Sequence, residues 1–142
     1  MKFSKLSAVA LLFGASAVFH SAMAQPVKPT GGVLTDSQGK TLYIFTKDAA
    51  NKSNCTGGCL AAWPAFTARP EGKPAGDLGI ITREDGTRQW THKERPLYYY
   101  VGDSKPGDKT GDKQNDVWFV IPAAADGKVS GAAPKAEGGY KY

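Results

Sequence analysis

Short apolar runs alternate with polar segments that contain glycine or proline along most of the chain. Six of these runs are rich in β-branched and aromatic residues, a composition that favours β-strands. They are 32–35, 41–46, 79–82, 87–91, 96–101 and 117–121. Asp85-Gly86 stands between the third and fourth runs and is typical of a tight hairpin turn. The pattern therefore predicts an all-β fold, arranged as a small sandwich or meander.

One segment departs from this pattern. Residues 59–63 (CLAAW) can form a single helical turn, which Pro64 ends because the residue before a proline disfavours the helical conformation. The 142 residues include 17 glycines and nine prolines, which also favours short elements joined by turns. At most one short helical turn, near 59–63, is expected.

An internal repeat organises the chain. The segment LYIFTKD at 42–48 matches LYYYVGD at 97–103, and the same offset relates Trp63 to Trp118. Leucine, tyrosine, aspartate and tryptophan recurring in one register indicate two copies of one structural unit.

The repeat sets the predicted domain organisation. A single domain over 25–122 contains two halves, about 31–68 and 78–122, joined by the Pro/Gly-rich connector 69–76. The sequence from 123 to 142 lacks apolar periodicity and is predicted to be a flexible tail.

The segment 1–24 has the pattern of a secretory signal peptide. Lys2 and Lys5 precede an apolar run at 6–19, and Ala22-Met23-Ala24 is a cleavage sequence that would leave Gln25 first. No second long apolar run follows, so no transmembrane segment is predicted in the mature chain. With no cysteine at the cleavage point for a lipid anchor, we expect a soluble protein that is periplasmic or secreted.

The composition of the predicted mature chain argues against several classes of partner and metal site. The formal charge of +5 falls to +3 when the leader removes Lys2 and Lys5, and the remaining basic residues are interspersed with acids. This pattern argues against nucleic acid as a partner. Both methionines and His20 also leave, so His92 is the last imidazole and neither His/Met haem ligation nor a multi-histidine metal site is possible in one chain. No metal and no cofactor are predicted.

The repeated motif carries a resemblance. Each copy reads Y-x-[FWY]-x-x-D, and the first is followed by C-x-x-x-C and by Trp63-Pro64. Over about 30–122 the chain resembles a bacterial family of secreted repeats of unknown function, whose members are often called predicted lipoproteins. The resemblance implies a location in the cell envelope and no established activity. Many relatives carry a lipid-anchor cysteine where this chain has Gln25.

Cys55 and Cys59 are the only cysteines. In an exported protein an even pair predicts a structural disulfide. A redox or metal role is the alternative, although the spacing is not that of a C-x-x-C redox site and Leu60 stands where covalent haem attachment requires histidine.

The motif aromatics allow two interpretations. They can fill a core between the halves, or they can line a cleft for a planar or sugar-like ligand. The residues concerned are Tyr43, Phe45, Trp63, Tyr98, Tyr100 and Trp118. A domain of this size needs large buried side chains, which favours the core.

Asp48 and Asp103 end the two motif copies. Each can accept hydrogen bonds from nearby backbone N–H groups and fix a turn, or the two can converge as an acid–base pair. No serine lies in a G-x-S-x-G context and no phosphate-binding G-x-x-x-x-G-K loop is present, so no catalytic residue is assigned.

These observations leave three hypotheses. The first is an exported, non-enzymatic module that binds a small ligand or another envelope protein. The second is a redox or metal accessory protein using Cys55 and Cys59, and the third is a small hydrolase using Asp48 and Asp103.

Overall fold

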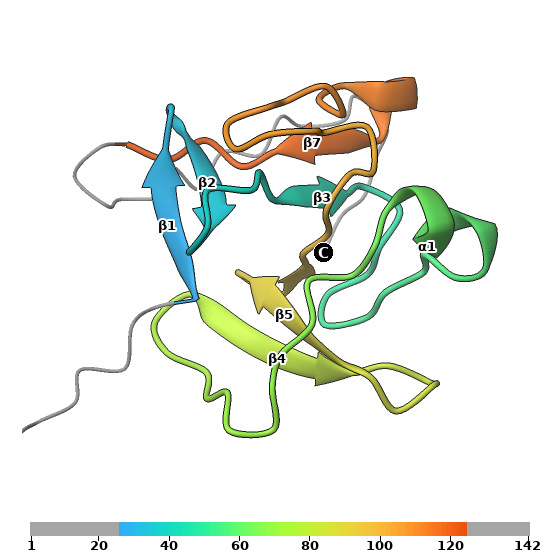
Figure 1. The fold of residues 1–142 in the computed structure, drawn as a ribbon. Helices are drawn as coiled ribbons and strands as arrows, with labels where there is room; N and C mark the ends of the chain where they lie inside the picture. Colours follow the sequence, from blue (N-terminus) through green and yellow to red (C-terminus); the bar gives the residue numbers. More distant parts are fainter. Residues whose placement is uncertain (1–25, 125–142) are drawn as a thin grey trace, which may run out of the picture.

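The computed structural model describes residues 26–124 (Figure 1). The predicted signal peptide and nearly all of the predicted tail lie outside these residues. Within them the chain forms seven strands, one short α-helix and one 3-10 turn. In chain order they are β1 Val27–Thr30, β2 Val33–Asp36, β3 Tyr43–Phe45, α1 Gly58–Ala62, β4 Leu78–Thr82, β5 Arg88–His92, β6 Arg95–Pro96, η1 Gln114–Asp116 and β7 Trp118–Val120. All strand pairs are antiparallel, so the all-β prediction is confirmed.

The predicted hairpin is present as β4 and β5. Asp85 Oδ1 accepts a hydrogen bond from Thr87 N at 2.9 Å, and Gly86 has φ +82°, a conformation that glycine adopts without steric cost. The helical turn is also present as α1, which begins one position earlier than predicted.

Two elements differ from the expected pattern. Strand β1 was not predicted, because Pro29 lacks a backbone N–H donor. The proline is tolerated here because β1 is at the edge of a two-stranded sheet and pairs only with β2. The predicted strand 96–101 is reduced to β6 and isolated bridges, because Tyr98 pairs with both Tyr43 and Ala65 rather than continuing one ladder.

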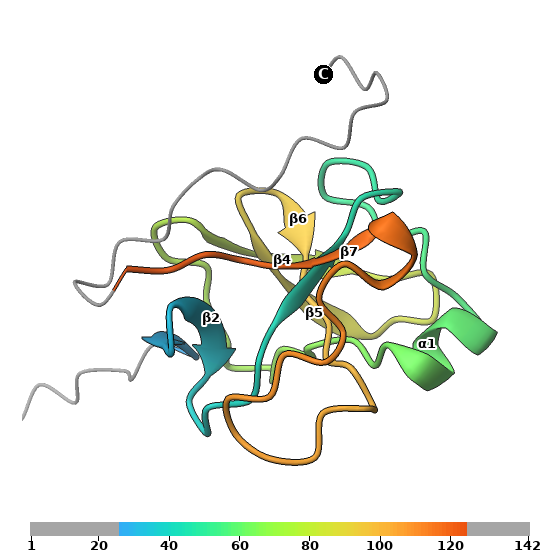
Figure 2. The ribbon, with the colours of Figure 1, turned by 90° about the horizontal axis from the view of Figure 1, so that it is seen from above.

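Each half pairs its last extended segment with the other half. Strand β7, from the second half, pairs with β3 of the first; β7 lies above β3 in Figure 1, and the two overlap when seen from above in Figure 2. In the first half, Ala65 pairs with Tyr98 and Thr67 pairs with Gln89 of β5. The two halves are therefore interlocked, because the backbone at the end of each half pairs with the other half.

Matching hydrogen bonds show an approximate two-fold symmetry. Leu34 N donates to Ile121 O at 2.8 Å, and its counterpart Trp90 N donates to Phe66 O at 2.9 Å. Tyr43 and Tyr98 stand at the centre, where each backbone N–H donates to the other's carbonyl at 2.8 and 3.0 Å. The repeat in sequence is thus a repeat in space.

Side chains alternate along the motif strands between two buried clusters. Leu42 and Ile44 point into a larger aliphatic cluster that also contains Leu97 and Trp90. Tyr43 and its counterpart in the second half point the other way, into a smaller aromatic cluster. This alternation is the period-two pattern of strands and gives the small domain two cores.

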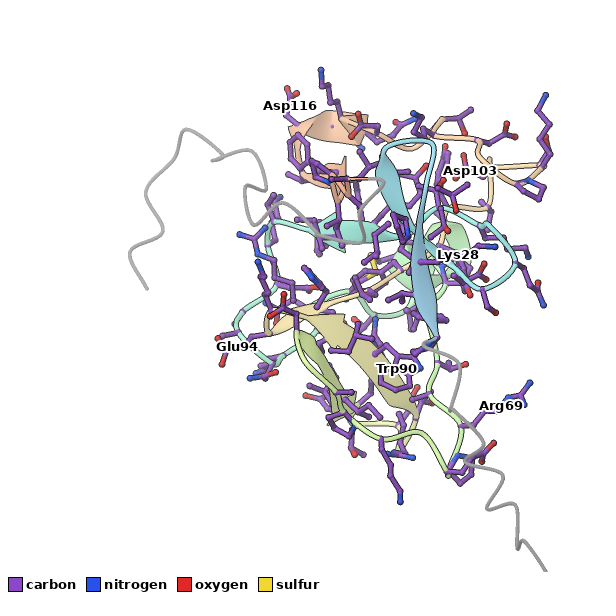
Figure 3. The ribbon with its side chains drawn as sticks, turned by 90° about the vertical axis from the view of Figure 1, so that its left-hand side faces the viewer. Lys28, Arg69, Trp90, Glu94, Asp103 and Asp116 are labelled. Carbon is purple, nitrogen blue, oxygen red and sulfur yellow. A yellow bond between two sulfur atoms is a disulfide. The ribbon has the colours of Figure 1, made fainter. Side chains whose placement is uncertain are left out.

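The connector closes against the larger cluster. Arg88 donates to the carbonyl oxygens of Arg69, Pro70 and Gly72 at 2.6 to 3.0 Å, and a Cβ at Gly72 would lie 3.1 Å from the Trp90 ring. Figure 3 shows Trp90 and Arg69 at the opposite end of the molecule from Asp103 and Asp116.

The packed region extends slightly beyond the predicted domain end. Ala123 is buried, and its N–H donates to Gly32 O at 3.0 Å. Among the described residues no helix is both long and apolar enough to cross a bilayer.

Candidate functional site

The tyrosine and aspartate of each motif copy are bound to those of the other copy. Tyr43 donates its hydroxyl hydrogen to Asp103 Oδ2 at 2.7 Å, and Tyr98 donates to Asp48 Oδ2 at 2.7 Å. The second carboxylate oxygen closes a loop in each half. Asp48 Oδ1 accepts from Asn54 N at 2.6 Å, and Asp103 Oδ1 accepts from Thr110 N at 2.9 Å. Each aspartate therefore joins its own loop to the tyrosine of the other half.

Burial controls the protonation of these groups. It raises the pKa of both Tyr43 and Tyr98 well above the ordinary phenol value, so both hydroxyls remain donors at neutral pH. Burial also raises the pKa of Asp48 to about 6, although hydrogen bonds from Asn54 N and Tyr98 and the nearby charge of Arg83 act in the opposite direction. Asp48 therefore changes charge close to neutral pH.

Four motif aromatics form one continuous stack. Phe45 stacks on Trp118 with 4.3 Å between ring centroids, Trp118 on Trp63 at 3.9 Å, and Trp63 on Tyr100 at 4.3 Å. The order is symmetric about the Trp63–Trp118 contact. Tyr43 meets the stack edge-on, with its ring 5.4 Å from that of Trp63.

This stack belongs to the core. Trp63 and Trp118 have exposed fractions of 6% and 3%, and Tyr43 is fully buried. A Cβ at Gly111 would lie 2.7 Å from the Trp63 ring, so only a glycine lets the backbone cover this face of the stack. The structure therefore places the inner motif aromatics in the core, with Phe45 and Tyr100 half-buried at its ends.

Cys55 and Cys59 form a disulfide, which confirms the prediction. Cys55 is fully buried in the aromatic cluster, and Cys59 lies in α1. We refer to residues 51–60, which contain this ring, as the disulfide loop.

A cavity of about 300 Å³ lies between the disulfide loop and the turn of the β4–β5 hairpin, including the end of β4. Its walls are formed by 51–53, 56, 57 and 60 from the first half and by 81–85 from the second. Sequence reasoning missed this cavity, because its walls come from two segments far apart in the chain. No sequence motif relates one segment to the other. The motif aromatics do not line it.

Arg83 is the anchoring residue of the cavity. Its guanidinium donates to Ser53 Oγ at 2.7 Å, to Gln89 Oε1 at 2.6 Å and to the backbone oxygen of Cys55 at 2.6 Å. Ser53 Oγ in turn lies 2.6 Å from the Tyr98 hydroxyl, which donates to Asp48. A chain of hydrogen bonds thus connects the wall of the cavity to the half-buried carboxylate of Asp48.

Asp103 and His92 lie apart from this network. Asp48 and Asp103 belong to two separate hydrogen-bond networks, one in each half. His92 is buried on β5 with Nε2 3.9 Å from Asp77 Oδ2, and burial lowers its pKa. Within residues 26–124 no three histidine, cysteine, aspartate or glutamate residues cluster closely enough to hold a metal ion.

Comparison with known proteins identifies both halves. A family model described as "secreted repeat of unknown function" matches residues 27–67 and again 79–121, and its description supports a location in the envelope or outside the cell. No curated protein and no solved structure matches the chain. Each matched segment includes the residues that pair with the other half, and the chain belongs to the family of secreted repeats of unknown function, with one copy of the repeat in each half of the domain.

Proposed function

We propose that this protein is an exported, non-enzymatic binding module and that its ligand occupies the cavity between the disulfide loop and the β4–β5 hairpin. The family description and the leader-like segment 1–24 support export. On this proposal the leader is cleaved after Ala24, and the mature protein begins at Gln25 without a lipid anchor.

The observation that carries the proposal is the separation of the motif aromatics from the open surface of the domain. The aromatic residues of both motif copies are used to pack the halves together, and their faces contact one another. The cavity instead presents charged, hydroxyl and apolar side chains, with Arg83, Glu84, Ser53 and Leu60 among them. A few polar groups beside an apolar wall are typical of small-molecule sites.

Backbone amide NMR with a small fragment set tests the proposal. The set contains acetate, sulfate, methylammonium, glucose and glycerol, each added separately to the full-length exported protein. We expect at least one fragment to shift the amides of 51–57 and 81–85 together. Absence of shifts with every fragment, or shifts confined to the ends of the aromatic stack at Phe45 and Tyr100, would contradict the proposal.

A cavity-filling variant sharpens the test. Thr56 lines the cavity and is exposed, so Thr56→Trp should block the fragment without disturbing the core. Thr67 is also exposed but lies outside the cavity, and Thr67→Trp is the matched control. Loss of binding in both variants would indicate an indirect effect.

A further inference from the structure

The charge of the cavity defines a class of ligand more narrowly than its size does. Arg83 and Lys52 both line it, and neither takes part in a salt bridge among the described residues. The three acceptors that hold the Arg83 guanidinium are a hydroxyl, an amide oxygen and a backbone carbonyl, all of them neutral. The positive charge is therefore held in place without a carboxylate in contact with it.

The anchored guanidinium also retains free donors. Arginine carries five N–H donors, and three of them are used by residues within 26–124, which leaves two without a partner in this part of the chain. Two N–H groups on a planar guanidinium suit the oxygen atoms of a carboxylate or phosphate. Thr56 adds a hydroxyl to the cavity wall, and the backbone at Gly57 contributes no side-chain bulk.

Two acidic residues, Glu84 and Asp85, also line the cavity. Asp85 is exposed and turns one carboxylate oxygen to Thr87 N, within its own hairpin turn. Glu84 is also exposed, and it makes no salt bridge with Arg83 or Lys52. Of the four charged residues that line the cavity, Arg83 is therefore the one whose charge is fixed by several hydrogen bonds.

Asp48 is linked to Arg83 by a chain of hydrogen bonds. It reaches Arg83 through Tyr98 and Ser53, and its other direct partner is the backbone N–H of Asn54. Arg83 is the charged group that acts on the Asp48 carboxyl, which is a mutual attraction. When Asp48 is ionised it partly offsets the field of Arg83, and when it is protonated that offset disappears.

We propose that the cavity binds a small oxyanion, a carboxylate or a phosphate or sulfate group, through Arg83 and Lys52, and that protonation of Asp48 strengthens this binding. The inference rests on the proposed binding function and specifies its ligand class. Because the pKa of Asp48 is raised to about 6, affinity for an anion should rise as the pH falls from 7.5 to 5.5. The coupling acts through the protein, since Asp48 itself does not contact the anion.

Acetate and sulfate are the probes, because sulfate stays fully ionised and acetate mostly ionised across this pH range. Each is titrated into the full-length exported protein at pH 7.5 and 5.5 while the amides of 51–57 and 81–85 are followed by NMR. We expect affinity to be roughly threefold higher at pH 5.5. Asp48→Asn should bind with the affinity of the low-pH wild type and lose most of the pH dependence.

Two cation variants separate recognition from folding. Arg83→Gln should weaken binding at least about tenfold, the loss expected for a charge-assisted contact. Since Arg83 also holds the disulfide loop, the exposed Lys52→Gln provides a second variant that leaves those anchors intact and should weaken binding several-fold. Arg69→Gln, an exposed arginine on the connector, is the matched control and should bind normally.

The outcomes are distinct. Unchanged acetate and sulfate binding in both Arg83→Gln and Lys52→Gln would overturn the inference. Binding of methylammonium, glucose or glycerol at 51–57 and 81–85 without any anion binding would overturn it while leaving the proposed function standing. Absence of any fragment from this cavity would overturn both.

Discussion

Tyr43 in the first half of the domain donates its hydroxyl hydrogen to Asp103 in the second half, 2.7 Å away. The reciprocal bond from Tyr98 to Asp48 has the same length. The tyrosine and aspartate of one motif copy are therefore not hydrogen-bonded to each other. These two hydrogen bonds and the backbone pairing between the halves hold the two repeats together.

Removing either tyrosine hydroxyl should cost stability by a similar amount. A hydrogen bond from a buried donor to a carboxylate contributes roughly 1.5–3 kcal/mol, so Tyr43→Phe and Tyr98→Phe should each lower the free energy of unfolding within that range. Tyr100 is half-buried and its hydroxyl makes no hydrogen bond within residues 26–124, so Tyr100→Phe is the control and should cost about 0.5 kcal/mol or less. Urea denaturation measures all three.

Double-mutant cycles can show which aspartate each tyrosine uses. Combining Tyr43→Phe with Asp103→Asn should give a coupling of about 1 kcal/mol or more, because the two side chains share one bond. Combining Tyr43→Phe with Asp48→Asn should be additive within about 0.5 kcal/mol. The reverse result would mean that the motif residues pair within each half.

The chain sequence contains enough information for the repeat but not for this pairing between the halves. The offset from Leu42 to Leu97 and from Trp63 to Trp118 identifies equivalent positions, and the alternation along 42–45 predicts which side chains share a face. Both halves, however, offer the same tyrosine and the same aspartate. Pairing within a half and pairing between halves look identical in sequence, so only the three-dimensional path of the chain distinguishes them.

The cavity illustrates a second limit. Arg83 follows a strand and precedes a turn, where an arginine usually faces solvent, and no spacing relates it to Ser53 or Gln89. The three come together because β4, β5 and the disulfide loop meet behind Tyr98. A site built from single polar residues on different loops has no periodic signal.

Stability should depend on pH through Asp48. Its pKa is about 6 in the folded protein and 3.8 ordinarily, so the folded state binds this proton more tightly than the unfolded chain. The associated stability is fully present below pH 3.8 and is lost as the pH rises through 6, a change of roughly 2–3 kcal/mol.

The comparison with Asp48→Asn isolates this contribution. Burial lowers the pKa of His92, which makes the folded state lose stability as the pH falls through 6.5, opposite to the effect of Asp48. Both proteins contain His92, so its effect cancels in the difference between their unfolding free energies. As the pH falls from 7.5 to 4.5, that difference should change by roughly 2 kcal/mol in favour of the wild type. A difference independent of pH would contradict the assignment.

The backbone pairing between the halves should hold them together after the connector is cleaved. A protease site inserted between Lys73 and Pro74 lies in the exposed part of the connector, beyond the carbonyl groups that Arg88 binds. After cleavage the two fragments should co-elute on size exclusion, with a melting temperature that falls as the protein is diluted. Fragments that separate in native buffer would show that this pairing contributes little.

The disulfide should act locally. The ring it closes is short, so loop entropy predicts a stabilisation of only roughly 2 kcal/mol, and Cys55→Ala/Cys59→Ala should remain folded. The same change should reduce binding of acetate or sulfate, because the disulfide loop forms one wall of the cavity. A thiol assay should find no free thiol in protein purified without reductant. Two reactive thiols per chain would instead favour the redox hypothesis.

The central claim is that the motif aromatics form a shared core and that binding occurs elsewhere. Thermal melts of Trp63→Ala and Trp118→Ala test it most directly, since the two rings lie 3.9 Å apart at the centre of the stack. Truncating a buried aromatic costs roughly 3–5 kcal/mol, a large part of the stability of a small domain. Both variants should therefore be unfolded or melt far below the wild type, and by comparable amounts. Two near-native melts would contradict the account and return the aromatics to the role of a ligand-binding cleft.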